Sequence, residues 1–403
     1  MTENHYGYGL RNDEVPFASK IKPGRNWKSL NMDDQKKFMK GAFGDNRGGR
    51  TSYLQRMSWE EPARTVIAGA MNKATCQLHP GMKDKEVAEM FYDVTPQQLE
   101  NSLTVVELFA GGGLMALGLK RAGFTLVWAN DFDKNAVTAY RHNLGGHIHQ
   151  GDVNQLTAEE IPDADIISGG PPCQDFSVAG EGKGEAGDRG KLVWSYLKII
   201  EAKQPEAFIF ENVKGLITKK HRPTFDALLE KFNEIGYAVS WKLLNAWDFG
   251  VAQKRERVFI VGIRKDLGFE FQFPEPLPED VRTQVLRDVI GDLPEPSPSD
   301  YDGTTRTVFD SDNRKMEWEK ARHTIRSNGG KPIHPDDTTT ARGERPRRFT
   351  VRECLRIQSA PDSYIFPETM SLSAMYRVVG NGAPCRVAWY LGKALAEQLK
   401  IEV

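Results

Sequence analysis

The sequence is poor in the features that mark membrane, secreted and zinc-binding proteins. It has only four cysteines among 403 residues, and they stand far apart, at Cys76, Cys173, Cys354 and Cys385. So few and so widely spaced, they argue against a zinc-ligand pair and against a disulfide framework. No run of 18 apolar residues occurs, and the first residues do not resemble a signal peptide. We therefore expect a cytoplasmic protein without a membrane span.

An excess of positive charge is also missing. The chain has 54 Lys and Arg against 55 Asp and Glu, a net charge of −1. A nucleic-acid partner would have to be met by a local basic face rather than by the total charge. The hydrophobic content of 39% and charged content of 27% are those of an ordinary globular protein. The length suggests about two to three domains.

Short apolar runs alternate with helical patterns in the middle of the chain. The alternation predicts an α/β fold with a mostly parallel sheet covered by helices on both faces. Strands are predicted at 103–109, 126–129, 165–168, 207–210 and 257–263. Helices are predicted at 114–122, 192–203, 223–235 and 384–398.

The two flanking regions are different in character. Residues 1–100 are polar and rich in Gly, Asn and Lys, and residues 270–345 are rich in Pro, Asp, Thr and Gly. A weak repeat links the two, because 59–65 (Trp-Glu-Glu-Pro-Ala-Arg-Thr) is similar to 318–324 (Trp-Glu-Lys-Ala-Arg-His-Thr). Each copy is followed by a His-Pro pair. We expect both regions to be irregular modules attached to the α/β core.

A glycine-rich turn at 107–113 (Glu-Leu-Phe-Ala-Gly-Gly-Gly) marks a candidate cofactor site. It lies where a strand becomes a helix, and glycines there let backbone amides approach a ligand. Asp131 follows the next strand, where an acid can hold ribose hydroxyls, and Asp152 could bind an adenine amino group. Each Asp could instead be a helix cap or a turn residue. The pattern is neither a dinucleotide fingerprint nor a phosphate-binding loop, so S-adenosylmethionine is the favoured cofactor.

A candidate nucleophile lies in 169–177 (Gly-Gly-Pro-Pro-Cys-Gln-Asp-Phe-Ser) at the end of a predicted strand. Two glycines and two prolines make a rigid turn that would point Cys173 outward, where a thiolate can attack. Glu211 ends another apolar strand and could donate to a ring nitrogen. Arg255 and Arg257 alternate into a strand and could anchor a pyrimidine carbonyl, a phosphate or Glu211. A solvent-facing Glu and a solvated charge cluster are the plain alternatives.

Together these motifs resemble the cytosine-5 DNA methyltransferases, over about residues 103–265 and 347–395. The shared motifs follow the usual order of that family, which makes the resemblance specific. They are Phe-Ala-Gly-Gly-Gly at 109–113, Asn-Asp at 130–131, Gly-Asp at 151–152, Pro-Pro-Cys-Gln at 171–174, Glu-Asn-Val at 211–213 and Gln-Lys-Arg-Glu-Arg at 253–257. Thr-Val-Arg-Glu at 350–353, Gln-Ser-Ala-Pro-Asp at 358–362 and Gly-Asn at 380–381 complete the set.

The resemblance implies both a methyltransferase (Rossmann-like) fold and a mechanism. Cys173 would attack carbon 6 of a flipped-out cytosine while Glu211 protonates nitrogen 3, and carbon 5 would then take the methyl group from S-adenosylmethionine. Arg255 would contact the base, Arg257 would orient Glu211, and Gln253 would complete the catalytic set.

The resemblance also implies two sets of binding residues, and the cysteine spacing leads us to expect no metal. The cofactor set is Phe109, Ala110, Gly111, Gly112, Gly113, Asp131, Phe132, Asp152, Val153, Pro172 and Asn381. A glycine-rich loop over 174–191 would close on DNA, with Gln174, Ser177 and Arg189 at its contacts. A basic cluster could bind phosphate or read guanine, of which we favour phosphate; its members are Arg342, Arg345, Arg347 and Arg348.

The first 100 residues depart from the family pattern, in which the glycine-rich motif lies near the start. Residues 1–60 carry 11 Lys and Arg against 7 Asp and Glu, an excess suited to phosphate contacts. We predict bipartite target recognition, shared between 1–100 and about 286–372. The catalytic domain would span 101–285, and 373–403 would return to it. The alternative is a structural extension that packs on the core.

Two other functions are disfavoured by the sequence. A transfer-RNA cytosine methyltransferase is disfavoured, because the Cys-Phe-Thr that usually follows Glu-Asn-Val in that branch is missing. A DNA-binding regulator without catalysis is disfavoured by the intact Cys173, Glu211, Gln253 and Arg255. The expected partner is double-stranded DNA, bound by a monomer, with a cognate restriction endonuclease as a functional counterpart.

Overall fold

The chain divides into two compact units in the computed structural model. The smaller unit comprises 1–61, 70–90 and 291–353, and the larger comprises 62–69, 91–290 and 354–403. The structure describes residues 15–18, 20–22, 25–39, 55–57, 63–64, 77–78, 96–172, 191–278, 286–293, 308–309, 315–316 and 349–400. The chain returns to the larger unit after residue 353, whereas the sequence placed this boundary after 372.

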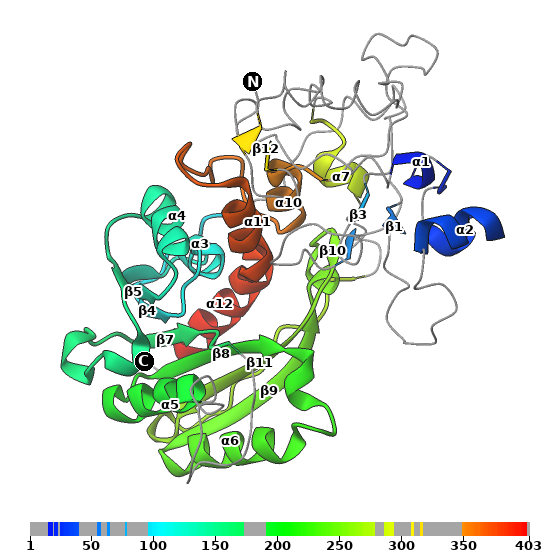
Figure 1. Ribbon diagram of the computed structural model, residues 1–403. Helices are drawn as coiled ribbons and strands as arrows, with labels where there is room; N and C mark the ends of the chain where they lie inside the picture. Colours follow the sequence, from blue (N-terminus) through cyan, green and yellow to red (C-terminus); the bar gives the residue numbers. More distant parts are fainter. Residues whose placement is uncertain are drawn as a thin grey trace, which may run out of the picture. The chain divides into compact units, whose positions relative to one another are not determined.

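A seven-stranded sheet forms the centre of the larger unit, in the order β6-β5-β4-β7-β8-β11-β9 (Figure 1). The first five of these strands are parallel, and β11 runs antiparallel to both of its neighbours, β8 and β9. The strands are β4 (Thr104–Leu108), β5 (Thr125–Asp131), β6 (Ile148–Gln150), β7 (Ile166–Gly169), β8 (Ala207–Val213), β9 (Tyr237–Asn245) and β11 (Glu256–Arg264). The predicted mostly parallel sheet is confirmed.

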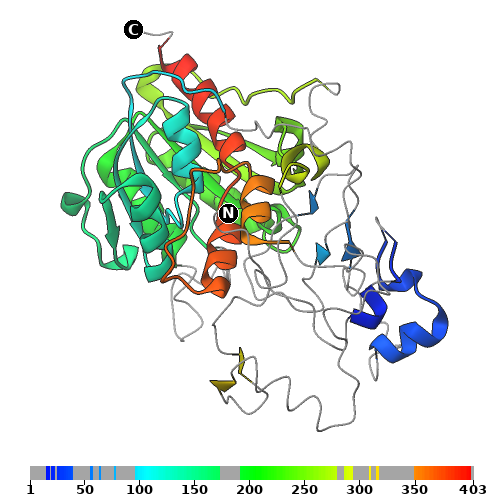
Figure 2. The same ribbon diagram turned by 90° about the horizontal axis from the view of Figure 1, so that it is seen from above.

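Helices cover both faces of this sheet. They are α3 (Leu114–Arg121), α4 (Lys134–Leu144), α5 (Lys191–Lys203), α6 (Arg222–Glu234) and α12 (Cys385–Lys400). Helix α11 (Leu372–Asn381) packs on α4, and α10 (Val351–Ile357) precedes it in the chain. In both views α12 lies beside α3 (Figure 1, Figure 2). Shorter elements are η5 (Val153–Gln155), η6 (Ala158–Glu160), η8 (Lys214–Ile217), η9 (Ala246–Phe249), η10 (Lys265–Leu267) and α7 (Leu286–Ile290).

Neighbouring residues of β4 enter different cores, because side chains alternate across a strand. Val105 packs into the apolar cluster that includes Leu119 of α3 and Leu391 of α12. Val106 packs into the opposite cluster, with Tyr196 of α5 and further residues of α6. Burial on both faces explains why this strand reads as an almost continuous apolar run.

A short segment of the N-terminal region belongs to the larger unit. Strand β2 (Ala63–Arg64) pairs in parallel with β10 (Gln253–Lys254), directly before Arg255. For Ala63 and Arg64, this pairing agrees with the alternative that the N-terminal region is a structural extension that packs on the core. The segment lies in the region that the sequence assigned to a recognition module.

The smaller unit contains a helical module at its N-terminal end, made of α1 (Val15–Ala18), η1 (Trp27–Ser29) and α2 (Met32–Met39). Trp27 and Phe38 are buried, with ring centroids 6.3 Å apart. This unit also contains two strand pairs, β1 (Gln55–Arg56) with β3 (Gln77–Leu78), and β12 (Val308–Phe309) with β13 (Lys315–Met316). Across the described ranges of the whole chain, every helix is too short or too polar to cross a membrane.

Candidate active site

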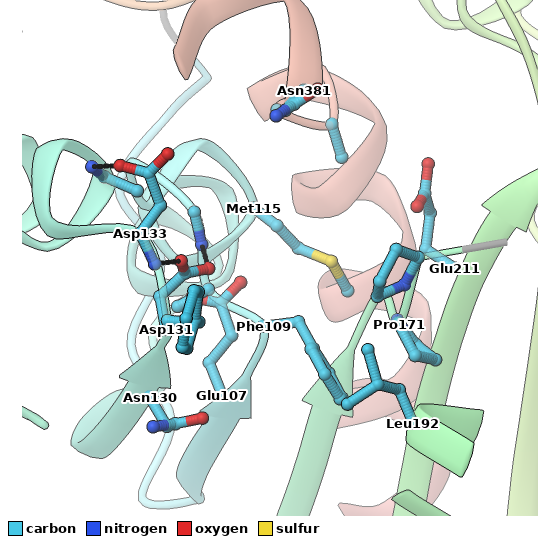
Figure 3. A pocket seen from close by; sticks show the side chains of 18 of the residues that line it. Glu107, Phe109, Met115, Asn130, Asp131, Asp133, Pro171, Leu192, Glu211 and Asn381 are labelled. Atoms are coloured by element: carbon cyan, nitrogen blue, oxygen red, sulfur yellow. Dashed lines mark hydrogen bonds between the residues drawn. The ribbon is translucent and has the colours of Figure 1, made fainter. Parts of the chain in front are cut away.

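A cavity of about 630 Å³ opens at the carboxyl ends of β4, β5, β7 and β8. Ligands of open α/β sheets bind at this edge, where the loops leave the strands. One side of the cavity carries Asp131 and Asp133, and the other carries Glu211 beside Pro171 (Figure 3). Twelve of the predicted cofactor and catalytic residues line it: Phe109, Ala110, Gly111, Asp131, Phe132, Asp152, Val153, Pro172, Glu211, Arg255, Arg257 and Asn381.

The glycine-rich turn forms one wall of the cavity. Phe109 has a φ of 55°, a left-handed conformation that costs energy for a residue with a side chain and that concentrates at functional sites. Gly111 has a φ of 56°, and a Cβ on it would have no other atom within 4 Å, so its backbone is open to the cavity. Its amide donates to Asp131 Oδ2 at 2.8 Å.

Gly112 and Gly113 do not line the cavity, although the sequence placed them in the cofactor set. A Cβ on Gly112 would lie 2.2 Å from Val378 Cγ1, and a Cβ on Gly113 would lie 2.4 Å from Leu144 Cδ1. These two glycines face inward and allow α3 to pack closely on α11 and α4. Their glycine identity therefore reflects packing rather than ligand contact.

Acidic groups gather in the half of the cavity next to this turn. Asp131 also accepts from the Asp133 amide at 2.8 Å, and burial raises its pKa. Glu107 is fully buried below the turn, and its burial, followed by the charge of Asp131, raises its pKa well above 4.5. Asp152 accepts from the Asn154 amide at 2.9 Å, so it caps η5 while also lining the cavity.

An apolar ring stands exposed in the same half. Phe132 follows Asp131 and keeps 77% of its surface accessible, which is unusual for a large apolar side chain next to a cavity. An exposed aromatic face beside acids provides a stacking surface for a planar ring. This half of the cavity can therefore hold a ligand that combines an aromatic base with hydroxyl groups or positive charge.

The other half contains a carboxylate and a guanidinium on adjacent strands. Arg257 Nε lies 3.0 Å from Glu211 Oε1, and the two side chains are 16% and 15% exposed. The antiparallel pairing of β11 with β8 sets Arg257 opposite Val213, two residues beyond Glu211. The pairing thus selects Glu211 from the three partners that the sequence left open for the arginines.

The turn that precedes Cys173 is fixed beside Glu211. Asn212 is buried and its Nδ2 donates to the Pro171 carbonyl at 3.0 Å. A Cβ on Gly170 would lie 3.0 Å from Glu211 Oε2, so the absence of a side chain lets the carboxylate approach the turn. Residues 171 and 172 therefore lead the chain toward the carboxylate side of the cavity.

Arg255 and Gln253 are buried rather than open to solvent. Arg255 is 2% exposed and donates from Nη1 and Nη2 to the Gly380 carbonyl, both at 3.2 Å. Burial lowers its pKa to about 9, so it stays cationic at neutral pH. Gln253 does not line the cavity, because its Nε2 donates to Gln358 Oε1 at 3.0 Å inside the core. Arg255 thus supports the 380–382 segment that carries Asn381, and Gln253 reaches it only through Gln358, whose Nε2 donates to the Gly382 carbonyl at 3.3 Å.

Several lining residues were not predicted, among them Glu107, Met115, Asn130, Asp133 and Arg377. Glu107 and Asn130 lie inside motifs that the sequence analysis quoted, so their positions were available signals. Arg377 could have been found as the residue one helical turn before Asn381 on α11. The predicted residues outside the described part of the chain are Cys173, Gln174, Ser177, Arg189, Arg342, Arg345, Arg347 and Arg348.

Comparisons with known proteins identify the family and the relatives of this chain. Residues 103–397 match the C-5 cytosine-specific DNA methylase family. The chain is 37% identical over 329 residues to the Type II methyltransferase M.FnuDI of Fusobacterium nucleatum, covering 74% of this chain and 95% of that protein. It is 38% identical over 329 residues to the Type II methyltransferase M.MthTI of Methanothermobacter thermautotrophicus, with 74% and 98% covered.

The fold also matches solved structures. The S. pombe Dnmt2 methyltransferase superposes with a TM-score of 0.54 at 20% identity, covering 74% of this chain and 99% of that chain. At this identity the likeness concerns the fold alone. The family match and the sequence relatives confirm the resemblance seen in the motifs. This chain belongs to the C-5 cytosine-specific DNA methylase family and is a DNA cytosine-5 methyltransferase.

Proposed function

We propose that this methyltransferase takes its methyl group from S-adenosylmethionine and transfers it through a covalent bond between Cys173 and carbon 6 of a flipped-out cytosine. The observation that carries this proposal is a single cavity with two chemically different halves. Acids and an exposed ring line one half, and the Glu211–Arg257 pair borders the other, beside the turn that leads to Cys173.

The acidic half fits S-adenosylmethionine. That molecule carries a positive sulfonium and an ammonium group, which carboxylates attract, whereas the same acids would repel a pyrophosphate. Asp131 would accept from the ribose hydroxyls, because each of its oxygens can accept more than the one amide it already holds. Phe132 would stack on the adenine. When bound, the cofactor supplies the methyl group that carbon 5 receives.

The other half fits the chemistry of a pyrimidine ring. Cys173 would attack carbon 6 as a thiolate, and Glu211 would place a proton on nitrogen 3, so that negative charge does not build up on the ring. Arg257 holds the Glu211 carboxyl in place, and Arg255 would contact the base from the cavity wall. After methylation, loss of the proton on carbon 5 and release of the thiolate give 5-methylcytosine.

The target must leave the DNA stack to reach this cavity, at a cost of a few kcal/mol that contacts in the pocket offset. We assign contacts with DNA to Gln174, Ser177 and Arg189. The arginine cluster at 342–348 would hold phosphates. The relatives' names as Type II methyltransferases support a role in protecting DNA from a cognate restriction endonuclease.

Target recognition would be bipartite. The grouping of 1–61 and 70–90 with 291–353 in one unit supports this proposal, because segments from both ends of the catalytic region could then present side chains to one DNA site. Truncation of residues 1–61 tests it by DNA binding. A folded truncation with unchanged affinity and sequence choice would leave only a structural role for this region.

The chemistry is tested in two steps. Bisulfite sequencing of DNA from cells that express the protein identifies the methylated site, and an oligonucleotide duplex with that site then serves as substrate. Cys173→Ala should abolish methyl transfer, and Cys354→Ala, a buried cysteine outside the cavity, should not. Transfer RNA should not be methylated. Methylation of the duplex by the Cys173→Ala variant would refute the covalent mechanism.

A further inference from the structure

Two consecutive residues, Tyr364 and Ile365, bind elements of the proposed cofactor half without lining the cavity. Tyr364 is buried, and its hydroxyl donates to the carbonyl of Gly112 at 2.7 Å. A buried tyrosine hydroxyl needs such a partner, and the acceptor here belongs to the glycine-rich turn. Residues 112 and 364 are thus joined by one direct hydrogen bond across 252 positions of sequence.

The Gly112 carbonyl lies just before α3, whose N-cap is Gly113. A Cβ on Gly112 would lie 2.7 Å from the Tyr364 hydroxyl oxygen, so the ring is in close contact with the turn. The hydroxyl therefore fixes the turn from its buried side.

The next residue along the chain, Ile365, is bound to α4. The Ile365 amide donates to Asn143 Oδ1 at 2.9 Å, and Asn143 Nδ2 donates to the Ile365 carbonyl at 2.8 Å. Asn143 lies on α4, whose N-cap is Asp133, directly after Asp131 and Phe132. Two consecutive residues, Tyr364 and Ile365, thus connect the glycine-rich turn with the last turn of α4.

We propose that Tyr364 and Asn143 are positioning residues that set the position of α4 relative to the glycine-rich turn, and thereby the affinity for the methyl donor. Tyr364, Ile365 and Asn143 do not themselves line the cavity, so they act through the Gly111 amide, Asp131 and Phe132. This inference rests on the proposed binding of S-adenosylmethionine in this half of the cavity.

The test is Tyr364→Phe, which removes one oxygen and keeps the ring. Tyr237→Phe is the matched control, because Tyr237 is equally buried and donates to the Pro205 carbonyl at 2.8 Å, outside the cavity. Binding of S-adenosylhomocysteine is measured by calorimetry, with thermal unfolding in parallel. We expect Kd to rise about fivefold to tenfold in Tyr364→Phe, the effect of one lost buried hydrogen bond, and less than about twofold in Tyr237→Phe.

Steady-state rates provide a second readout. The KM for S-adenosylmethionine should rise with Kd in Tyr364→Phe while kcat stays within about twofold of the wild-type value. Asn143→Ala should weaken binding in the same direction, and it keeps the inference testable if one variant folds poorly. Equal Kd values for the wild type, Tyr364→Phe and Asn143→Ala, with lowered Tm, would overturn the inference. A wild-type protein that binds neither molecule would instead overturn the proposed cofactor.

Discussion

The turn that leads to the proposed nucleophile depends on one buried amide, and Asn212→Ala tests this dependence. Asn212 Nδ2 donates to the Pro171 carbonyl at 3.0 Å, and its Oδ1 accepts from the Val213 amide at 2.9 Å. The substitution removes both bonds. The Pro171 carbonyl loses its donor in a buried place, whereas Val213 is exposed and its amide can bond to water. At about 1–3 kcal/mol for one buried group left without a partner, the free energy of unfolding should fall by roughly 1–3 kcal/mol.

The catalytic effect should exceed the effect on binding. A displacement of about 1 Å at a reacting group can lower a rate about a hundredfold, and the turn that would move leads directly to Cys173. We therefore expect kcat to fall between about tenfold and a hundredfold, with the KM for DNA within about threefold of the wild-type value. Single-turnover methylation of the target duplex measures the chemical step without product release.

A matched variant separates the effect on the position of the turn from the effect on the stability of the fold. Asn101 has the same pair of bonds, with Nδ2 donating to the Ala122 carbonyl at 2.8 Å and Oδ1 accepting from the Leu103 amide at 2.9 Å, at a site away from the cavity. Asn101→Ala should lose stability and keep the wild-type single-turnover rate. A wild-type rate in Asn212→Ala, or an equal loss of rate in both variants, would refute the positioning role.

Three further predictions concern single residues. Glu211→Gln should lower kcat by about a hundredfold or more, because an amide cannot supply the proton to nitrogen 3, while gel-shift affinity for DNA is retained; a variant with full activity would exclude Glu211 as the acid. Burial raises the pKa of Glu107 above its unfolded value near 4.5, so the folded state binds this proton more tightly and wild-type stability falls as pH rises from about 4.5 through the folded pKa. Glu107→Gln lacks this loss, so its Tm relative to the wild type should increase with pH over that range, and a difference independent of pH would contradict the reasoning. Gly112→Ala should destabilise the fold by about 1–3 kcal/mol, because its Cβ would lie 2.2 Å from Val378 Cγ1, and denaturant unfolding at the wild-type level would show that the turn can move.

Much of the fold could be predicted because its strands are buried on both faces. The runs that became β4, β7 and β8 are mostly apolar, and such runs bounded by turns can be recognised as strands from the sequence. Strand β9 was not predicted, because it lies at an edge of the sheet and most of its residues are only partly buried. Helix α4 was also missed, since its apolar residues are spread among polar ones.

The sequence by itself determined the chemical inventory of this protein: the order of the motifs, the glycine-rich turn, and the acids that follow the strands. The tertiary structure decided which of these groups meet. Arg257 reaches Glu211 because β11 pairs antiparallel with β8, whereas Gln253 turns into the core to meet Gln358. Gln253 and Gln358 are more than a hundred positions apart in the sequence. Contacts of this kind depend on strand pairing and packing, which local sequence patterns do not encode.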